Sequence, residues 1–401
     1  MTITQLRNFQ NYNKSCYFFI AMEKNDSNSP PKKPRVLVYL FGSLGDTLVA
    51  IPALRAIRRR FPAAELILLQ NVPAKENIVK ASQVIPVDLI DGYLEYANLP
   101  GKFNRVFDFF RLWHELRRSD FQAAVYLVAS ERPPRSVWRD ILFFRSTGIL
   151  NLFGFHAFSK GELYPLDEKG SPALTPSEAV RKTTRLKIDG IESAPADFRR
   201  PFLHFSTAEI EYLKNWLAVR RTNPAARLIS IAPGCKTLAN RWSDENFIEI
   251  GRRLLAEGDC ELLVVGGRAE RVAAQKLISA WGAGINAAGE FSVRESGAAL
   301  SICDFHFGLD TGTTHLAAAV GTPCFALFHG RDNPGHWFPQ GGGHTIVFHP
   351  VACAGCRLFV CPVPNHPCMN NISVEAVWEN LRDFGRNSNH KIDSPTRVIA
   401  V

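Results

Sequence analysis

The chain has 401 residues, with 47 Lys and Arg against 38 Asp and Glu, so its formal net charge is +9. This length exceeds what one hydrophobic core usually supports, and two domains are expected. The basic excess suits an anionic partner such as a nucleotide, a nucleic acid or an acidic membrane surface, although it also favours mere solubility. The sequence has no apolar run near the roughly 18 residues of a membrane-spanning helix and no nucleic-acid reader motif. We therefore expect a cytoplasmic protein that binds no nucleic acid.

Residues 1–34 are rich in Asn, Ser, Lys and Pro, which is typical of a disordered extension. The apolar stretch CYFFIAM at 16–22 is too short for a secretory signal, and the segment before it is polar rather than basic. Met22 opens a polar run of its own, so the translation start is either Met1 or Met22.

Strands and helices alternate along the first half of the remaining chain. Continuous apolar runs at 35–41, 65–70 and 121–130 are typical of strands that are buried on both faces. Between the first two runs, apolar residues such as Leu48 and Ile51 recur at helical spacing. Strands separated by helices indicate a parallel, doubly wound sheet.

The same alternation returns in the second half of the chain. Strand-like runs cover 227–234, 260–267, 304–310 and 322–328, and helices are expected at 207–221, at 244–257 and after residue 374. A segment rich in Pro, Ser and charge separates the two halves. We predict an N-terminal domain of residues 35–205, a second domain of residues 206–380 and a tail of residues 381–401.

Ligands of doubly wound domains bind at the carboxyl ends of the strands, so residues directly after strands are candidates for a site. The turn GSLGD, residues 42–46, follows the first strand and places one carboxylate, Asp46, where a helix begins. This acid could cap the helix or act chemically on a ligand.

Three turns of the second half carry groups that suit a nucleotide. GLDTGTTH at 308–315 opens a helix, where backbone N–H groups and the hydroxyls of Thr311, Thr313 and Thr314 could bind a phosphate or simply cap the helix. In APGCKTLANRW at 232–242, the Lys, Thr and Arg side chains could neutralise a diphosphate or belong to an ordinary surface loop. The acid in VVGGRAE at 264–270 could accept the hydroxyls of a ribose or remain solvated.

These three stretches and GSLGDTLVAIPALRAIRRRFPAAEL at 42–66, in this order and spacing, resemble glycosyltransferase family 9, the heptosyltransferase family. The resemblance implies an α/β fold of the GT-B type, in which two doubly wound Rossmann-like domains face each other across a cleft. It also implies an inverting transfer with Asp46 as the general base. This acid would take the proton of an acceptor hydroxyl as its oxygen attacks the anomeric carbon opposite the leaving nucleotide.

The resemblance assigns a donor site as well. Glu270 corresponds to the ribose-binding acid, and Phe291 in GEFSV corresponds to a side chain that packs on the nucleobase, although an aromatic ring there could equally belong to the core. The implied donor-binding residues are Lys236, Thr237, Arg241, Glu270, Phe291, Asp310, Thr311, Gly312, Thr313 and His315.

One position departs from the family pattern. Family members commonly carry a lysine directly before the Arg-Trp or His-Trp pair of the second loop, whereas this chain has NRW with Asn240 in that place. Either Lys236 or Arg241 supplies the missing charge, or the handling of the donor has changed.

For the acceptor, the resemblance implies a phosphorylated, lipid-anchored saccharide bound by the N-terminal domain. The stretch 130–150 interleaves four arginines with aromatic residues, which suits a phosphorylated glycolipid at a membrane surface or an ordinary packed helix with a basic outer face. The implied acceptor-binding residues are Ser43, Arg132, Arg135 and Arg139.

The resemblance thus implies a metal-independent enzyme without a cofactor. Its donor would be a nucleotide sugar, ADP-heptose, and its acceptor would be the lipopolysaccharide core or a related lipid-linked saccharide. It would work in the cytoplasm, in peripheral contact with the inner face of the anionic inner membrane. A non-catalytic nucleotide-sugar-binding protein of GT-B fold and a sugar-nucleotide epimerase are the alternatives, although an epimerase would not be expected to carry the GSLGD turn.

Four cysteines crowd into one short stretch, whereas the others are scattered among apolar neighbours as reduced, buried thiols would be. The first two have zinc-like spacing, but the later gaps are not those of a standard zinc finger. Structural zinc, disulfides and free thiols all remain possible for Cys353, Cys356, Cys361 and Cys368.

Overall fold

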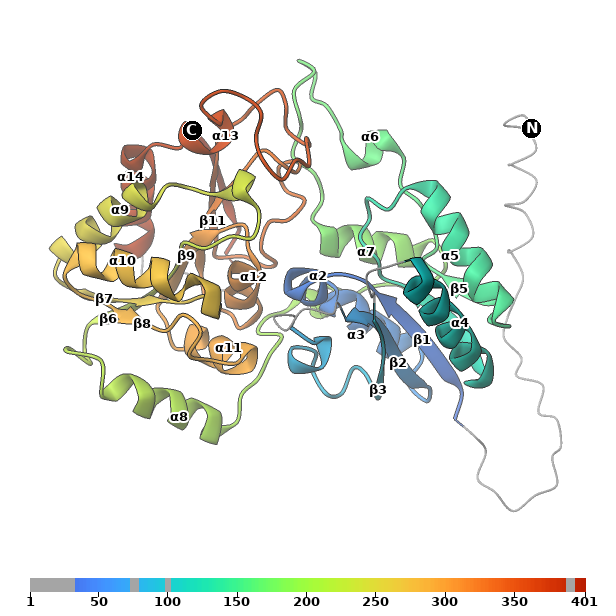
Figure 1. Cartoon of the computed structure of the whole chain (residues 1–401). Coiled ribbons are helices and arrows are strands. Elements are labelled where there is room, and N and C mark those ends of the chain that lie inside the picture. Colours follow the sequence, from blue (N-terminus) through green and yellow to red (C-terminus); the bar gives the residue numbers. More distant parts are fainter. Residues whose placement is uncertain (1–32, 73–78, 98–101, 387–393) are drawn as a thin grey trace. The chain divides into compact units, whose positions relative to one another are not determined.

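The computed structural model describes residues 33–72, 79–97, 102–386 and 394–401 (Figure 1). These residues form two parallel sheets with helices packed on them. Nearly all of the expected disordered extension, residues 1–34, lies outside the described residues.

The first sheet has five parallel strands in the order β3-β2-β1-β4-β5. At its centre, Val38 pairs with Leu68 on one side and with Val125 on the other. A strand with neighbours on both edges and helices on both faces has no solvated side, which explains the continuous apolar run of the first strand. The strands are β1 (Arg35–Leu40), β2 (Glu65–Val72), β3 (Gly92–Ala97), β4 (Phe121–Tyr126) and β5 (Asn151–Phe153).

The second sheet has seven parallel strands in the order β12-β11-β10-β9-β6-β7-β8. In both sheets the first strand along the chain lies inside the sheet, and the strand order reverses beside it, which is the doubly wound topology. The predicted parallel α/β fold is therefore confirmed. The strands are β6 (Arg227–Ala232), β7 (Cys260–Val264), β8 (Ile285–Asn286), β9 (Phe305–Leu309), β10 (Cys324–Phe328), β11 (Thr345–Phe348) and β12 (Arg397–Ala400).

Helices connect the strands, as the alternating pattern predicts. The helices of the first half are α2 (Leu44–Val49), α3 (Ile51–Arg60), α4 (Lys102–Arg118), α5 (Pro134–Ser146), α6 (Lys160–Leu163) and α7 (Glu178–Lys187). Those of the second half are α8 (Thr207–Ala218), α9 (Asp244–Ala256), α10 (Arg271–Trp281), α11 (Val293–Ser301), α12 (Gly312–Ala319), α13 (Pro367–Asn370) and α14 (Val374–Arg386).

Residues of the first sheet alternate between two cores, because successive side chains of a strand point to opposite faces. Val38 shares one core with Ile57 of α3 and Leu186 of α7. Leu37 faces the other core, where it meets residues of α4 and α5 such as Phe144.

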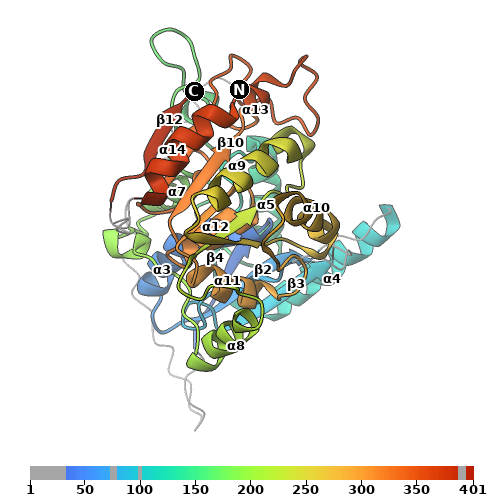
Figure 2. The ribbon, with the colours of Figure 1, turned by 90° about the vertical axis from the view of Figure 1, so that its left-hand side faces the viewer.

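One apolar core runs through both halves of the chain. Helices α9, α10 and α14 lie beside one another on one face of the second sheet, where Phe247, Trp281 and Leu381 share a core (Figure 2). On the opposite face, Leu316 of α12 belongs to the same cluster of buried residues as Val38 of the first sheet. Burial of shared apolar surface therefore joins the two sheets.

The segment between the sheets contacts both of them. Arg59 of α3 pairs with Asp197 at 2.5 Å, while the backbone N–H of Phe202 donates to the carbonyl oxygen of Ala319 in α12 at 2.7 Å. The domain limits at residues 205 and 206 stay a prediction. Within the expected tail of residues 381–401, β12 pairs with β11 and extends the second sheet.

Among the described residues, none of the helices combines the length and the apolar character that a membrane crossing requires.

Helix α7 buries a charged cluster that also reaches the second half of the chain. Its Glu178 lies 3.0 Å from Lys182 Nζ and 2.8 Å from His336 Nε2, and Ser130 Oγ donates to it at 2.5 Å. Burial alone would raise the pKa of Glu178, but Lys182 and His336 hold this pKa well below its ordinary range. Because His336 follows β10, these ion pairs tie α7 to a loop of the second sheet.

Removing the Glu178 carboxylate should destabilise the protein, because Lys182 would stay buried without its counter-charge. We expect Glu178→Gln to lower the free energy of unfolding by about 3–5 kcal/mol at pH 7, as measured by urea denaturation. Glu115→Gln on an exposed position of α4 is the control and should change this free energy by less than about 0.5 kcal/mol.

The depressed pKa of Glu178 also fixes a pH dependence. Its stabilisation is fully present above the ordinary glutamate pKa of about 4.3 and is lost as the pH falls from there through the folded-state pKa. The difference between wild type and Glu178→Gln should therefore shrink as the pH falls below about 4.3. A difference that stays constant as the pH falls well below about 4.3 would contradict the role of the charge.

Candidate functional site

The turn after β1 places Asp46 in the first turn of α2. Ser43 is the N-cap of this helix, and Gly42 before it has a φ of +149°, which favours glycine. A Cβ atom on Gly42 would lie 2.2 Å from Asp46 Cγ. The carboxylate thus occupies the space that any side chain at position 42 would need.

Asp46 takes part in a capping box. The backbone N–H of Ser43 donates to Asp46 Oδ2 at 2.8 Å, and the Ser43 hydroxyl donates to the same oxygen at 3.1 Å. No described residue donates a hydrogen bond to Oδ1. The capping role and the chemical role of this acid are therefore compatible, because the cap orients the carboxylate through one oxygen and leaves the other for a ligand.

The turn after β9 opens α12 with an unpaired hydroxyl. Thr311 is the N-cap, but its side chain makes no capping bond, and its Oγ1 is buried without a hydrogen-bond partner among the described residues. A buried hydroxyl without a partner is costly, so it marks a place where a ligand atom would complete the bonding. The positive end of α12 and the backbone N–H groups of Gly312 and Thr313 favour an anion there.

The Thr314 hydroxyl was expected to donate a hydrogen bond to a phosphate. In the structure it stabilises this turn instead. Its Oγ1 donates to the carbonyl oxygen of Leu309 at 2.6 Å and lies 3.2 Å from His306 Nε2. Burial lowers the pKa of His306 to about 3, so this ring is neutral near pH 7.

The first turns of α2 and α12 lie against each other. A Cβ atom on Gly45 would lie 3.2 Å from His315 Cδ2, and a Cβ atom on Gly312 would lie 3.2 Å from Leu44 Cδ2. These distances are tighter than ordinary packing, so glycine at both positions permits the approach. The structure therefore brings the Asp46 turn and the expected phosphate turn together.

Asp310, which precedes the Thr311 N-cap, lies between two histidines. His329 Nε2 is 2.9 Å from one carboxylate oxygen, and His315 Nε2 is 3.7 Å from the other. Burial alone would raise the pKa of Asp310, but His315 and His329 hold it well below its ordinary range. Asp310 is therefore ionised near pH 7. The sequence did not indicate His329, because it follows an apolar strand without any recognisable motif.

The loop after β6 presents its two basic residues at the surface. Lys236 is exposed and has no ion pair with a described residue, whereas Arg241 pairs with Asp244 at 2.8 Å. Thr237 is the N-cap of the short helical turn η4 (Leu238–Asn240). Asn240 is 8% exposed, and its Oδ1 has no hydrogen-bond partner among the described residues. Asn240, which stands where family members commonly have a lysine, is thus a buried residue of this loop.

Glu270 lies between the loops that follow β6 and β7. A Cβ atom on Gly234 would lie 1.9 Å from Glu270 Oε1, and a Cβ atom on Gly266 would lie 2.5 Å from Oε2. The backbone N–H of Gly267 donates to Oε2 at 2.5 Å. Two glycines therefore make room for this acid at the carboxyl end of the sheet, where a ribose was expected.

Phe291 packs against helix α8. Its half-buried ring meets Trp216 edge to face at 4.7 Å between centroids, and Arg220 covers Trp216 at 3.9 Å. Phe291 also contacts the small core between α8 and α11. Phe291 therefore contributes to the core, which is one of the two roles that the sequence left open for it.

Two of the expected acceptor residues meet at a buried acid. Arg139 NH2 lies 2.7 Å and Arg132 NH2 lies 3.3 Å from oxygens of Asp140, whereas Arg135 is exposed. Arg132, Arg139 and Asp140 line a cavity of about 460 Å³. Its other walls are mainly aromatic and include Tyr39, Phe41, Tyr96, Phe109, Phe143 and Phe144. One lining residue, Phe41, directly precedes Gly42 of the Asp46 turn in the sequence.

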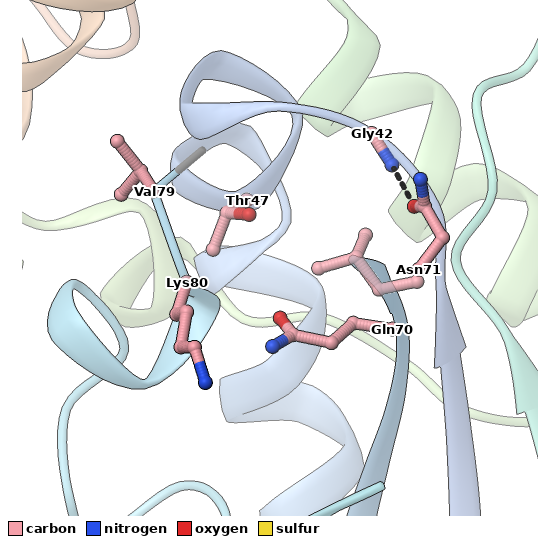
Figure 3. Close-up of a pocket in the computed structure, with 7 residues that line it drawn as sticks. Gly42, Thr47, Gln70, Asn71, Val79 and Lys80 are labelled. Atoms are coloured by element: carbon pink, nitrogen blue, oxygen red, sulfur yellow. Dashed lines mark hydrogen bonds between the residues drawn. The ribbon is translucent and has the colours of Figure 1, made fainter. Parts of the chain in front are cut away.

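A smaller cavity of about 10 Å³ lies beside the same turn and has room for one water molecule (Figure 3). It is lined by Gly42, Thr47 and residues of the second strand and the segment after it, among them Gln70 and Asn71. The backbone N–H of Gly42 donates to Asn71 Oδ1 at 3.3 Å, so β2 helps to fix the turn.

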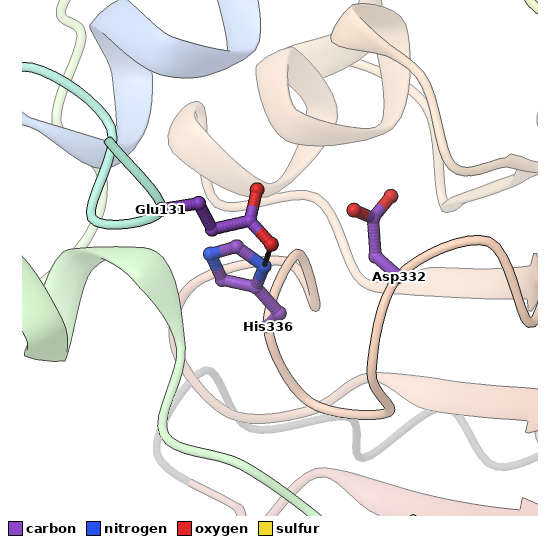
Figure 4. Close-up of side chains that lie close together, drawn as sticks. All are labelled: Glu131, Asp332 and His336. Carbon is purple, nitrogen blue, oxygen red and sulfur yellow. Dashed lines mark ion pairs between the residues drawn. The ribbon is translucent and has the colours of Figure 1, made fainter. Parts of the chain in front are cut away.

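Two overlapping sets of side chains lie close enough for one metal ion. Glu131, Asp332 and His336 form one set (Figure 4), and Asp310, His329 and Asp332 form the other. In each set the ligand atoms all lie within 4.8 Å of one another.

Other side chains already satisfy most of these groups. Glu131 accepts a hydrogen bond from Tyr164 at 3.0 Å and pairs with Arg357, while His336 bonds to Glu178 at 2.8 Å. Ion pairs and hydrogen bonds therefore account for these acids without requiring a cation.

The four clustered cysteines are free thiols in the structure. Cys353 and Cys356 are exposed, Cys361 is half-buried and Cys368 is buried. Among the described residues, cysteines contribute to neither of the two sets that could hold a metal ion. Whether these cysteines bind zinc stays a prediction.

Comparisons with known proteins find similar sequences and similar folds. The model of glycosyltransferase family 9 (heptosyltransferase) matches residues 176–366. Lipopolysaccharide heptosyltransferase 2 of Escherichia coli (strain K12) is 23% identical over 315 residues, which cover 73% of this chain and 82% of that protein.

Two solved structures share the fold. The glycosyl transferase family 9 protein from Veillonella parvula DSM 2008 superposes with a TM-score of 0.66 at 18% identity, covering 88% of this chain and 97% of that one. The E. coli ADP-heptose lps heptosyltransferase II superposes with a TM-score of 0.57 at 18% identity, covering 87% of this chain and 98% of that one. The expected GT-B fold is thereby confirmed, and the match over residues 176–366, together with the related heptosyltransferase sequence, shows that this chain is similar to glycosyltransferase family 9.

Proposed function

We propose that this chain is a family 9 glycosyltransferase that moves a sugar, heptose from ADP-heptose, to the lipopolysaccharide core or a related glycolipid with inversion at the anomeric carbon. The observation that carries the proposal is the contact between the turns of Asp46 and Thr311. A carboxylate with one unbonded oxygen lies at a helix start that packs against a second helix start with an unpaired hydroxyl. The names of the related proteins support the choice of donor and acceptor.

In the proposed reaction, Asp46 Oδ1 accepts the proton of the acceptor hydroxyl while this oxygen attacks the anomeric carbon. The C–O bond to the diphosphate breaks on the opposite face, and ADP leaves with the electron pair. The start of α12, with Thr311 and Thr313, binds the diphosphate, and Lys236 or Arg241 offsets its charge. Glu270 accepts hydrogen bonds from the ribose hydroxyls.

On the acceptor side, Arg132 and Arg139 suit a phosphate group, and the aromatic walls of the 460 Å³ cavity suit a sugar ring. Asp140 between the two guanidinium groups keeps them in place until the ligand arrives. We further propose that the protein works in the cytoplasm, in peripheral contact with the inner face of the inner membrane, without a cofactor.

Asp46→Asn should lower kcat by about 10²- to 10⁴-fold, because the amide cannot accept the proton, while the affinity for ADP stays nearly unchanged. Turnover of ADP-heptose with a truncated lipopolysaccharide measures the first quantity, and calorimetric titration of ADP measures the second. Glu295→Gln is a matched control, because Glu295 closes the same type of capping box at the start of α11 with a Ser292 N–H bond of 2.7 Å. Near-normal turnover of Asp46→Asn would remove Asp46 from the mechanism.

The donor base is tested by a thermal-shift screen with ADP, UDP, GDP, CMP and dTDP. We expect ADP alone to raise Tm, by the equivalent of about 2.7 kcal/mol at a hundredfold excess over Kd. Glu270→Ala should lose most of this shift, and Glu295→Ala should keep it. If another nucleotide stabilises the protein, the donor is a sugar carried by that nucleotide. If none does, the result favours the non-catalytic alternative over an active transferase.

Turnover should need no metal ion, because the clustered acids around Asp332 are already held by histidines and basic side chains. Dialysis against EDTA should leave the rate of transfer within about twofold of that of the untreated enzyme. Loss of turnover that one equivalent of a divalent cation restores, and that Asp332→Asn prevents, would instead place a metal at this cluster.

A further inference from the structure

Helices α4 and α5 expose large apolar side chains to solvent. Phe107 of α4 is 71% exposed and Phe110 is 62% exposed, while Trp138 of α5 is 58% exposed and Leu142 is 64% exposed. Single exposed apolar residues are common on soluble proteins, but several on two adjacent helices form a patch that calls for an explanation.

The two helices form one surface. Phe109 and Phe143 pack with ring centroids 5.0 Å apart, and Trp113 Nε1 donates to Ser146 Oγ at 2.9 Å. Leu116 of α4 belongs to the same core cluster as residues of α5. Because both helices bury their inner faces in one core, their outer faces point to the same side of the first sheet.

Helical spacing separates the exposed apolar residues from the packing ones. On α4, Leu112 and Leu116 are four residues apart and face the core, whereas Phe107 and Phe110 lie three residues apart on another face. Helix α4 therefore has a second apolar face that it does not need for folding.

The charge of this surface is strongly one-sided. Among the described acids of α4 and α5, Glu115 is exposed, while Asp108 and Asp140 have side chains only 12% and 8% exposed, and both pair with arginines. Among the side chains of the two helices that the structure describes, the exposed basic ones are Arg111, Arg117, Arg118, Arg135, Arg139 and Arg145.

We propose that the outer faces of α4 and α5 dock on an anionic lipid bilayer, with Phe107, Phe110 and Trp138 in the interface and the arginines on lipid phosphates. A surface of aromatic residues framed by basic side chains is what a bilayer interface binds. A second copy of the chain is the less favourable partner, because a symmetric contact would bring arginines against arginines.

The surface is continuous with the 460 Å³ cavity. Phe109, Arg139 and Phe143 belong to both, and Phe41, which also lines the cavity, directly precedes Gly42 of the Asp46 turn in the sequence. A lipid-anchored acceptor could thus enter from the bilayer without leaving it. This role of the surface in acceptor entry rests on the proposed function. Membrane binding itself is measured without donor and without turnover.

The test is flotation of the full-length protein with two kinds of vesicle. Vesicles of phosphatidylglycerol and phosphatidylethanolamine should bind the protein, and vesicles of phosphatidylcholine alone should bind it much less. Phe107→Ser combined with Phe110→Ser should weaken binding to the anionic vesicles at least about tenfold. Val219→Ser combined with Val272→Ser is the matched control, because these valines are 80% and 76% exposed in the other half of the chain.

Fluorescence gives a second, local measurement. Brominated lipids in the anionic vesicles should quench the emission of the wild type, and Trp138→Phe should remove most of this quenching. Thermal unfolding with ADP present shows whether each variant keeps its fold and donor site, so failure of the membrane proposal is distinguished from failure of the donor proposal.

Three outcomes would overturn the proposal. They are the absence of flotation with anionic vesicles, equal flotation of the Phe variant and the control, and quenching that persists in Trp138→Phe. Self-association in sedimentation velocity that the Phe variant abolishes, without any vesicle binding, would assign the surface to a second copy instead.

Discussion

The site depends on the contact between two helix starts, α2 and α12. Gly45 faces the His315 ring and Gly312 faces the Leu44 side chain at distances that leave no room for a Cβ atom in ordinary packing. A Cβ atom at either position would push the facing side chain away by a few tenths of an ångström. The shared apolar core below them, which contains Leu48 of α2 and Leu316 of α12, holds the two helices in this arrangement.

A buried network of charges extends this arrangement. Asp310 is ionised because two histidines surround it, and Glu178 is ionised because a lysine and a third histidine surround it. Two of these histidines, His329 and His336, come from the loop after β10. This loop therefore connects the polar end of the second sheet with α7, at a desolvation cost that only the complete network offsets.

Local patterns predicted most of the fold. Long apolar strands such as β1 and turns with glycine at strand ends are visible in a short window of sequence, and the Asp46 and Thr311 turns were found in this way. The strands β3, β5, β8, β11 and β12 were not predicted; β5 and β8 have three and two residues, which carry no periodicity. Helix α7 was not predicted, because its buried face consists largely of charged residues such as Glu178, Arg181 and Lys182, whose partners include residues distant in sequence.

The difference between local patterns and long-range contacts also explains which parts of the site were not predicted from the sequence. His329, Glu131 and His336 acquire their roles from partners far along the chain, and no local motif marks them. The outer apolar face of α4 was also missed, because a sequence alone does not show that Leu112 and Leu116 fill the core while Phe107 and Phe110 stay exposed.

Capping boxes alone do not identify functional acids in this protein. Ser159, Ser206 and Ser292 each pair with a glutamate three residues later at the start of an ordinary helix. Asp46 and Glu270 accept the same bond from the N-cap backbone N–H, but each follows a buried strand, and its carboxylate lies where a Cβ atom of a neighbouring glycine would be. Because glycine has no side chain, nothing at that position covers the acid. The helix cap itself does not require a glycine there. The combination of a capping acid, a strand end and a glycine beside the carboxylate is therefore a physical reason to place the ligand at these two turns rather than at the other three.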